Sequence, residues 1–143
     1  MLTATELLKH KGTAVHSVAP EATVFDALVL MAEKNIGALV VVEEGRPVGM
    51  FSERDYARKC ALRGKFSRET PVRELMTTSL VTITPETEVR ACMSLMTKHQ
   101  IRHLPVLESE RLAGILSIGD VVKSIIEDQD DSIGFLNRYI IGR

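Results

Sequence analysis

The chain has few of the residues that stabilise small secreted or metal-dependent proteins. Its 143 residues contain no tryptophan and only two cysteines, Cys60 and Cys92. Neither cysteine has a partner at metal-binding spacing, and no charged-then-apolar leader opens the chain, so we expect reduced thiols in a cytoplasmic protein. The four histidines also lack metal-binding spacing, and we therefore predict no metal site.

Long apolar runs and an excess of basic residues are also missing. The longest strongly apolar stretch, residues 38–42, is far shorter than the roughly 20 residues of a membrane-spanning helix, which predicts no membrane insertion. Lysine and arginine total 18 against 19 acidic residues, for a net charge of −1, and the basic residues are scattered. Two tyrosines and four phenylalanines are too few for a base-stacking surface. These features argue against a nucleic-acid partner.

What the chain does have is an internal repeat. Residues 15–59 align with residues 80–124 without a gap, and thirteen positions are identical. The shared positions include the pairs Gly49/Gly114, Ser52/Ser117 and Asp55/Asp120. A repeated supersecondary unit predicts two copies related by a pseudo-twofold axis, so that a cleft between them is built from both copies.

Each copy carries the same order of structural signals. A short extended segment (residues 14–18 and 80–83) precedes Pro-Glu, which ends a strand and favours a helix start. An amphipathic helix follows, capped in the first copy by Thr23, and two β-rich runs joined by a tight polar turn then form a hairpin. A second helix begins near Ser52 or Ser117. The predicted fold class is therefore α/β, with two pseudo-symmetric repeats of strand, helix, strand, strand and helix, each a small sheet packed on two helices.

The same signals divide the chain into three regions. Residues 1–68 hold an N-terminal segment and the first repeat, residues 69–131 the second repeat, and residues 132–143 a C-terminal helical segment. The join at residues 63–70 is polar and predicted to be an exposed linker. Apolar helix faces that include Met31, Met93 and Met96, or else the terminal segments, predict a homodimer contact, because large apolar patches seldom stay open to water. The alternative is that these methionines fill the ordinary core.

The strongest local signal for function is Gly-x-x-Ser-x-x-Asp at the end of each copy's last strand. A serine hydroxyl and the amide groups of a helix N-terminus suit an anionic oxygen. Aspartate can accept two hydrogen bonds from a vicinal diol such as a ribose, and the strand glycine leaves room for a flat ring. The combination indicates a nucleoside phosphate. Taken alone, the Ser-x-x-Asp spacing is more typical of a helix capping box.

The repeat order, both motifs, and the runs Asn-Ile-Gly-Ala-Leu (35–39) and Gln-Ile-Arg-His-Leu-Pro-Val (100–106) resemble the cystathionine-β-synthase (CBS) domain family. The likeness covers residues 3–127 as a tandem pair, or Bateman module, and is strongest to small stand-alone bacterial members of signal-transduction type. It implies a cleft between the copies that binds an adenosine-containing ligand. AMP and NAD(H) are the first candidates, with ATP and S-adenosylmethionine as further ones.

The resemblance also implies roles for individual residues. Asp55 and Asp120 would hold ribose hydroxyls, and Ser52 and Ser117 would meet phosphate. The adenine would lie against the opening strands and the first residues of the buried strands. This set comprises His16, Thr82, Ile36, Gly37, Ala38, Ile101, Arg102 and His103.

The basic residues near the expected cleft differ between the copies. Arg102 and His103 have uncharged counterparts in the first copy, whereas Arg54 has an uncharged counterpart in the second. We therefore expect two unequal clefts, one that uses Arg102 and His103 for phosphate and another that relies on Arg54 and Lys65. Without the family likeness, Arg102 is equally well a surface arginine. His103 is then more typical of a core-edge histidine, and Lys65 of a solvated loop charge.

These inferences predict a regulatory module that binds an adenine nucleotide, senses energy or redox state, and changes conformation or affinity for a regulated protein. Two alternatives stay open: a structural or oligomerisation scaffold with an unused cleft, and an enzyme that acts on a bound nucleotide. The sequence has neither a nucleophile elbow nor a P-loop, so we predict no catalytic residues. Arg58 and Lys59 are interpreted as solvated charges.

Overall fold

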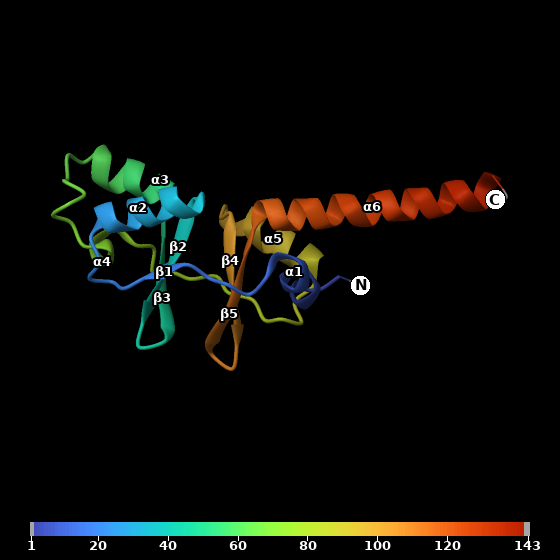
Figure 1. Ribbon diagram of the computed structural model, residues 1–143, viewed down its shortest axis with the longest axis horizontal. Helices are drawn as coiled ribbons and strands as arrows, with labels where there is room; N and C mark the ends of the chain where they lie inside the picture. The colour runs from blue at the N-terminus through green and yellow to red at the C-terminus, as the bar shows by residue number, and fades with distance from the viewer. Residues whose placement is uncertain (1, 142–143) are drawn as a thin grey trace.

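The computed structural model describes residues 2–141, with side chains described as far as residue 129. Two halves lie side by side with their hairpins pointing the same way, and a long helix projects from the second half (Figure 1).

The first half contains β1 (Ser17–Val18), α2 (Val24–Lys34), β2 (Ala38–Glu43), β3 (Arg46–Ser52), α3 (Glu53–Asp55) and the π-helix η1 (Tyr56–Ala61). The second contains α5 (Val89–His99), β4 (His103–Glu108), β5 (Arg111–Ser117) and α6 (Ile118–Ile141). Two further helices, α1 (Ala4–Lys11) and α4 (Val72–Leu75), precede the halves.

Sheet topology confirms the predicted repeat. In the first half β2 pairs with β1 in parallel and with β3 antiparallel. In the second half β4 and β5 pair antiparallel, and a single parallel bridge between Ile83 and Val106 takes the place of β1. The second sheet therefore has two strands and a bridge where three strands were expected.

Backbone conformation repeats as closely as the sheet pairing does. Asn35 ends α2 and Gln100 ends α5, both in the left-handed region with φ of 54°. Both hairpins shift register at equivalent places, after Val41 and after Val106. Equal irregularities at equivalent positions show that one backbone unit has been used twice.

The short helices α1 and α4 are exchanged between the halves. Helix α1 precedes the first repeat in sequence, but Ala4, Leu7 and Leu8 are buried in the second core. Helix α4 precedes the second repeat, but Val72 and Leu75 are buried in the first core. The N-terminal segment, expected with the first repeat, thus packs on the second. This exchange ties the two halves together without a shared hydrophobic core.

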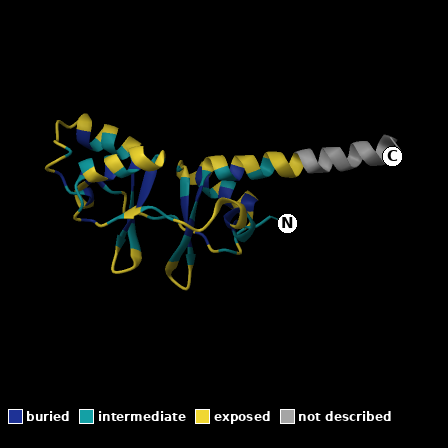
Figure 2. Ribbon diagram, viewed as in Figure 1, coloured by how far each residue is buried: buried dark blue, intermediate teal, exposed yellow. Residues whose placement is uncertain are grey.

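The strands and the inner helix faces form the buried interior, whereas the hairpin tips and outer helix faces are exposed (Figure 2). Met31 and Met96 are buried in the two cores, and Met93 packs against the second core. The expectation that these methionines form a dimer contact is wrong for Met31 and Met96, because the apolar stripes of α2 and α5 face the sheets.

Helix α6 continues to Ile141 with no break at the predicted boundary before residue 132. The apolar face expected at Ile133, Leu136 and Ile140 lies outside the described side chains. Among the described residues, none of the helices has the length and apolarity needed to cross a membrane.

Candidate functional site

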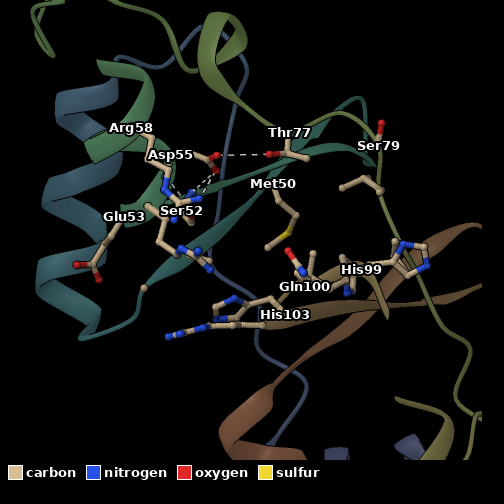
Figure 3. Close-up of a pocket in the computed structure, with 18 of the residues that line it drawn as sticks. Met50, Ser52, Glu53, Asp55, Arg58, Thr77, Ser79, His99, Gln100 and His103 are labelled. Carbon is tan, nitrogen blue, oxygen red and sulfur yellow. Dashed lines mark hydrogen bonds between the residues drawn. The ribbon is translucent and has the colours of Figure 1, made fainter. Parts of the chain in front are cut away.

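A cavity of about 600 Å³ lies where the motif of the first repeat faces the second repeat. Side chains from α3 and η1 stand on one side, and His99, Gln100 and His103 stand on the other (Figure 3). The segment after α4 supplies Thr77 and Ser79 between them. Eight residues from the predicted set line this cavity together: Gly37, Ala38, Ser52, Arg54, Asp55, Ile101, Arg102 and His103.

Ser52 and Asp55 form a reciprocal cap at the start of α3. The Ser52 amide donates to Asp55 Oδ2 at 3.0 Å, and the Asp55 amide donates to Ser52 Oγ at 3.1 Å. The Ser52 hydroxyl also donates to Oδ2 at 3.0 Å. The capping-box interpretation of the motif is therefore confirmed. The cap uses Asp55 Oδ2, so the other carboxylate oxygen can serve a second role.

Asp55 Oδ1 contacts two other residues that line the cavity. The Thr77 hydroxyl donates to it at 3.4 Å, a bond drawn in Figure 3, and Lys59 Nζ lies 3.0 Å away. Lys59 also donates to the carbonyl of Leu75 at the end of α4, at 3.1 Å. The motif carboxylate is thus linked to the exchanged helix. The Asp55 side chain is only 14% exposed, and desolvation strengthens such charge-assisted contacts.

Basic side chains from both halves converge on the cavity. Arg54, Arg58 and Lys59 come from the first half and Arg102 from the second, against two acidic lining residues, Glu53 and Asp55. The expectation that Arg54 and Arg102 belong to separate clefts is therefore wrong. The pseudo-twofold axis sets the α3 end of one repeat opposite the β4 start of the other.

The interpretation of Arg58 and Lys59 as solvated charges missed two cavity residues. Their spacing could have found them, because each lies four residues after Arg54 or Asp55, and residues at this spacing share a helix face. His99 and Thr77 were also missed. Their signal was weaker, since both enter the cavity only through tertiary packing.

Burial lowers the pKa of His103, and the nearby charges of Lys11 and Arg102 lower it further, whereas Asp120 raises it. The net pKa lies below the ordinary value of 6.5. His103 is therefore neutral at pH 7, and one ring nitrogen can accept a hydrogen bond while the other donates one.

The strand glycines of both motifs are covered: a Cβ atom on Gly49 would lie 2.7 Å from Met76 Sδ, and one on Gly114 would lie 2.6 Å from Leu8 Cδ2. Neither glycine leaves the room for a flat ring that the sequence predicted.

The equivalent position in the second repeat is filled by helix α1. Lys11 Nζ lies 2.6 Å from Asp120 Oδ2 and 2.8 Å from the Ile115 carbonyl oxygen. The carboxylate of the second motif is therefore paired with a lysine of the same chain.

Ser117 and Asp120 repeat the cap of the first motif, with amide-to-side-chain distances of 2.7 and 3.1 Å. Burial raises the pKa of Asp120, but the bond from Lys11 and the Ser117 amide lower it more, leaving it below its ordinary value. A carboxylate stabilised in this way stays ionised well into the acid range.

Four other residues of the predicted set also lie outside the cavity. Val81 lines it, whereas its neighbour Thr82 is exposed, because successive side chains of an extended segment point to opposite sides. Ile36 packs against the first core. Lys65 lies 3.4 Å from Glu74, away from the cleft. His16 is half-buried on the opening segment of the first repeat, at the position equivalent to Val81 in the second.

Comparison with known proteins decides the family. The model of the CBS domain matches residues 12–61 and again residues 72–127. The chain belongs to the CBS domain family. It is a tandem CBS pair, as the resemblance implied, and the α/β fold expected from the repeats is confirmed.

Two relatives show how much of this CBS pair is shared. It is 39% identical to the mitochondrial CBS domain-containing protein CBSX3 of Arabidopsis thaliana, over 98% of this chain and 72% of that one. It is 35% identical to the CBS domain-containing protein YhcV of Bacillus subtilis, over 87% of this chain and 89% of that one. A solved CBS-domain protein from Burkholderia ambifaria superposes with a TM-score of 0.85 at 45% identity, covering 89% of this chain and 96% of that one.

Two less similar structures contain ligands or higher assemblies. The CBS pair of protein MJ0100, with a TM-score of 0.78 at 22% identity, was solved with 5-methylthioadenosine and S-adenosyl-L-methionine. At this identity the likeness shows the fold alone. A CBS-CP12 protein from bloom-forming cyanobacteria, 32% identical with a TM-score of 0.75, is hexameric.

Proposed function

We propose that the cavity binds an adenine nucleotide and that the CBS pair changes conformation or partner affinity in response, without catalysing a reaction. The observation that carries the proposal is the convergence of Asp55 with basic side chains from both halves on one cavity of about 600 Å³. That volume is within the range of small-molecule sites. A ligand that touches both halves favours one relative arrangement of them, which is what a regulatory response requires.

The lining residues supply a place for each part of a nucleotide. Asp55 Oδ1 can accept hydrogen bonds from ribose hydroxyls once Thr77 and Lys59 turn away from it. The starts of β2 and β4, with Val81, offer small and apolar contacts for the adenine. Arg54, Arg58 and Arg102 then lie ready for phosphate, which arginine can bind through two parallel hydrogen bonds.

The charge of the cavity orders the ligand candidates. Four basic residues against two acidic ones favour the phosphates of AMP, NAD(H) and ATP. S-adenosylmethionine carries a positive sulfonium and no phosphate, so it is a less favoured ligand for this basic cavity than the nucleotides are. AMP and NAD(H) are therefore the first ligands to test.

A scaffold with an unused cleft is the second candidate function. It is favoured by the caps, since Ser52 and Asp55 already satisfy each other and α1 fills the second motif. If the protein is a scaffold, no nucleotide should stabilise it against unfolding. If it is a sensor, at least one nucleotide should.

A thermal-shift panel of AMP, ADP, ATP, NAD, NADH and S-adenosylmethionine separates these functions. A ligand at 100 times its dissociation constant adds about 2.7 kcal/mol to stability, which is easily seen as a rise in melting temperature. Arg102→Ala should reduce the shift, and Arg111→Ala at an exposed hairpin tip should leave it unchanged. If no member of the panel shifts melting of the wild-type protein, the sensor proposal is wrong.

We also propose that the chain forms a homodimer and acts on a regulated partner protein in the cytoplasm. The dimer is supported by an exposed apolar stripe on α6, where Ile118, Val122 and Ile126 repeat every four residues. Residues at this spacing lie on one helix face. Three aligned apolar side chains of this size favour burial against another surface.

A further inference from the structure

The ammonium group of Lys59 has three acceptors at the edge of the cavity. Its Nζ lies 3.0 Å from Asp55 Oδ1, 3.1 Å from the Leu75 carbonyl oxygen and 3.4 Å from Thr77 Oγ1. A lysine ammonium has three donors, so each donor has a partner here. The Thr77 hydroxyl also donates to Asp55 Oδ1 (Figure 3), which closes the network. Lys59 therefore lines the cavity as a charge that is already paired.

The second repeat has no equivalent of this lysine. Ser124 stands at the position of Lys59 in the gap-free repeat alignment, and the cation at Asp120 comes instead from Lys11 of α1. The backbone differs too, since residues 56–61 form the π-helix η1 whereas the equivalent residues 121–126 belong to the α-helix α6. π-Helical turns are rare and frequently lie at functional sites. Lys59 is therefore specific to the motif that faces the cavity.

A ribose hydroxyl at Asp55 Oδ1 takes the oxygen that Lys59 now uses. The Lys59 side chain is 32% exposed and that of Asp55 14% exposed, so water replaces the lost partner only in part. Leaving a partly buried charge without its partner is costly. An anionic oxygen on the ligand removes that cost, because it pairs with the ammonium group in place of Asp55. The network therefore favours ligands that carry an anion close to the ribose.

We propose that Lys59 is a specificity-determining residue that makes the cavity select 5′-phosphorylated nucleosides over free nucleosides. When a nucleotide binds, the ribose takes Asp55 Oδ1 and the Lys59 ammonium group turns to the phosphate, so one ion pair replaces another. A free nucleoside breaks the same pair and offers no anion in return. The inference rests on the proposed nucleotide function and names the ligand class of that site.

Lys59 differs in this role from the arginines of the cavity. Arg54, Arg58 and Arg102 attract a phosphate when it is present, and their removal weakens only ligands that carry one. Lys59 also acts against ligands that lack a phosphate, because it competes with the ribose for Asp55. Specificity of this kind combines attraction to one ligand with a penalty against another. The distinguishing sign is an adenosine affinity that rises when Lys59 is neutralised.

Lys59→Met tests the exchange in the full-length protein. Methionine keeps most of the aliphatic stem and removes the ammonium group. Adenosine should then bind about twofold to fivefold more tightly, the range expected when a partly exposed ion pair no longer has to be broken. AMP loses the contact between its phosphate and the ammonium group. The ratio of the adenosine Kd to the AMP Kd, measured by isothermal titration, should therefore fall at least about tenfold.

Lys65→Met is the matched control, because it removes the same group from a lysine that pairs with Glu74 away from the cleft. It should leave both dissociation constants unchanged. Lys59→Arg keeps the positive charge and should keep most of the preference for AMP, which a purely structural role of the side chain does not require. Lys59→Gln can still donate to the Leu75 carbonyl and repeats the test if Lys59→Met melts early.

The outcomes separate the role of Lys59 from the nucleotide function. Wild type that binds neither AMP nor adenosine overturns the role of Lys59, and a silent thermal-shift panel overturns the nucleotide function with it. Wild type that prefers AMP, with an unchanged ratio in Lys59→Met, overturns the role of Lys59 and leaves the nucleotide function standing. A variant that weakens AMP and adenosine by the same factor shows that Lys59 only supports the site, which also overturns the proposal.

Discussion

Lys11 Nζ lies 2.6 Å from Asp120 Oδ2, so an ammonium group from the exchanged helix α1 covers the carboxylate of the second motif. In the first motif Lys59 Nζ lies 3.0 Å from Asp55, but Lys59 belongs to the same helical segment and lines the open cavity. Both aspartates thus have a lysine partner. A ligand at Asp55 needs the Thr77 and Lys59 side chains to turn, whereas a ligand at Asp120 must displace the Lys11 ammonium group that α1 holds there.

We expect Lys11→Met to open the second motif to nucleotide. Methionine keeps most of the apolar stem but removes the ammonium group that competes for Asp120. Calorimetric titration should give one nucleotide per chain for the wild type and approach two for Lys11→Met. The stability loss should be below about 1 kcal/mol, because the pair is partly exposed.

Lys9→Met is the matched control for this experiment, since Lys9 is exposed on the same helix. It should leave the stoichiometry at one. A stoichiometry that stays at one in Lys11→Met as well would show that α1, rather than its lysine, closes the second motif.

Acidification should destabilise the protein in two separate windows. The folded-state pKa of His103 lies below 6.5, so the unfolded chain binds more protons below that pH and stability falls. The pKa of Asp120 lies below 3.8, so its stabilising effect is present above that value and is lost as the pH falls through the folded pKa.

Melting curves taken from about pH 7.5 down to about pH 3 check both windows, since each follows from the linkage between proton binding and stability. His103→Gln should flatten the fall just below pH 6.5, and Asp120→Asn should flatten only the more acid one. If His103→Gln leaves the upper window as steep as in wild type, another group controls it.

Asp55→Asn should weaken nucleotide binding at least about tenfold, because a hydrogen bond to a charged acceptor contributes about 1.5–3 kcal/mol. The asparagine oxygen can still accept from the Ser52 amide, so the loss of capping stability should stay near or below about 1 kcal/mol. Asp120→Asn is the matched control, because Lys11 covers that carboxylate. Isothermal titration of both variants tests the assignment, and equal affinities for wild type and Asp55→Asn would contradict it.

The repeat made much of this fold predictable. Equivalent residues such as Ser52 and Ser117 adopt equivalent caps, because local sequence determines how a helix starts. The exchange of α1 was not predictable, since Lys11 and Asp120 are 109 residues apart and no periodic signal reports such packing. The sequence predicted only part of the site, because some of its residues depend on local sequence and others on how the repeats pack. Its motif residues are local, whereas the meeting of Arg54 with Arg102 depends on how the two repeats face each other.

Because Arg54 and Arg102 line one cavity, we expect substitutions of the two arginines to have coupled effects on the affinity for AMP. Charge-assisted contacts are about twice as strong as neutral ones, so removing either arginine should narrow the difference in affinity between AMP and adenosine. If both arginines hold the same phosphate, the loss in Arg54→Ala/Arg102→Ala should differ from the sum of the two single losses by at least about 0.5 kcal/mol. Titration of the four proteins with AMP and with adenosine completes the cycle. Strictly additive losses would show that the two arginines do not hold the same phosphate. Equal weakening of AMP and adenosine would remove the phosphate role, because only contacts to phosphate distinguish the two ligands.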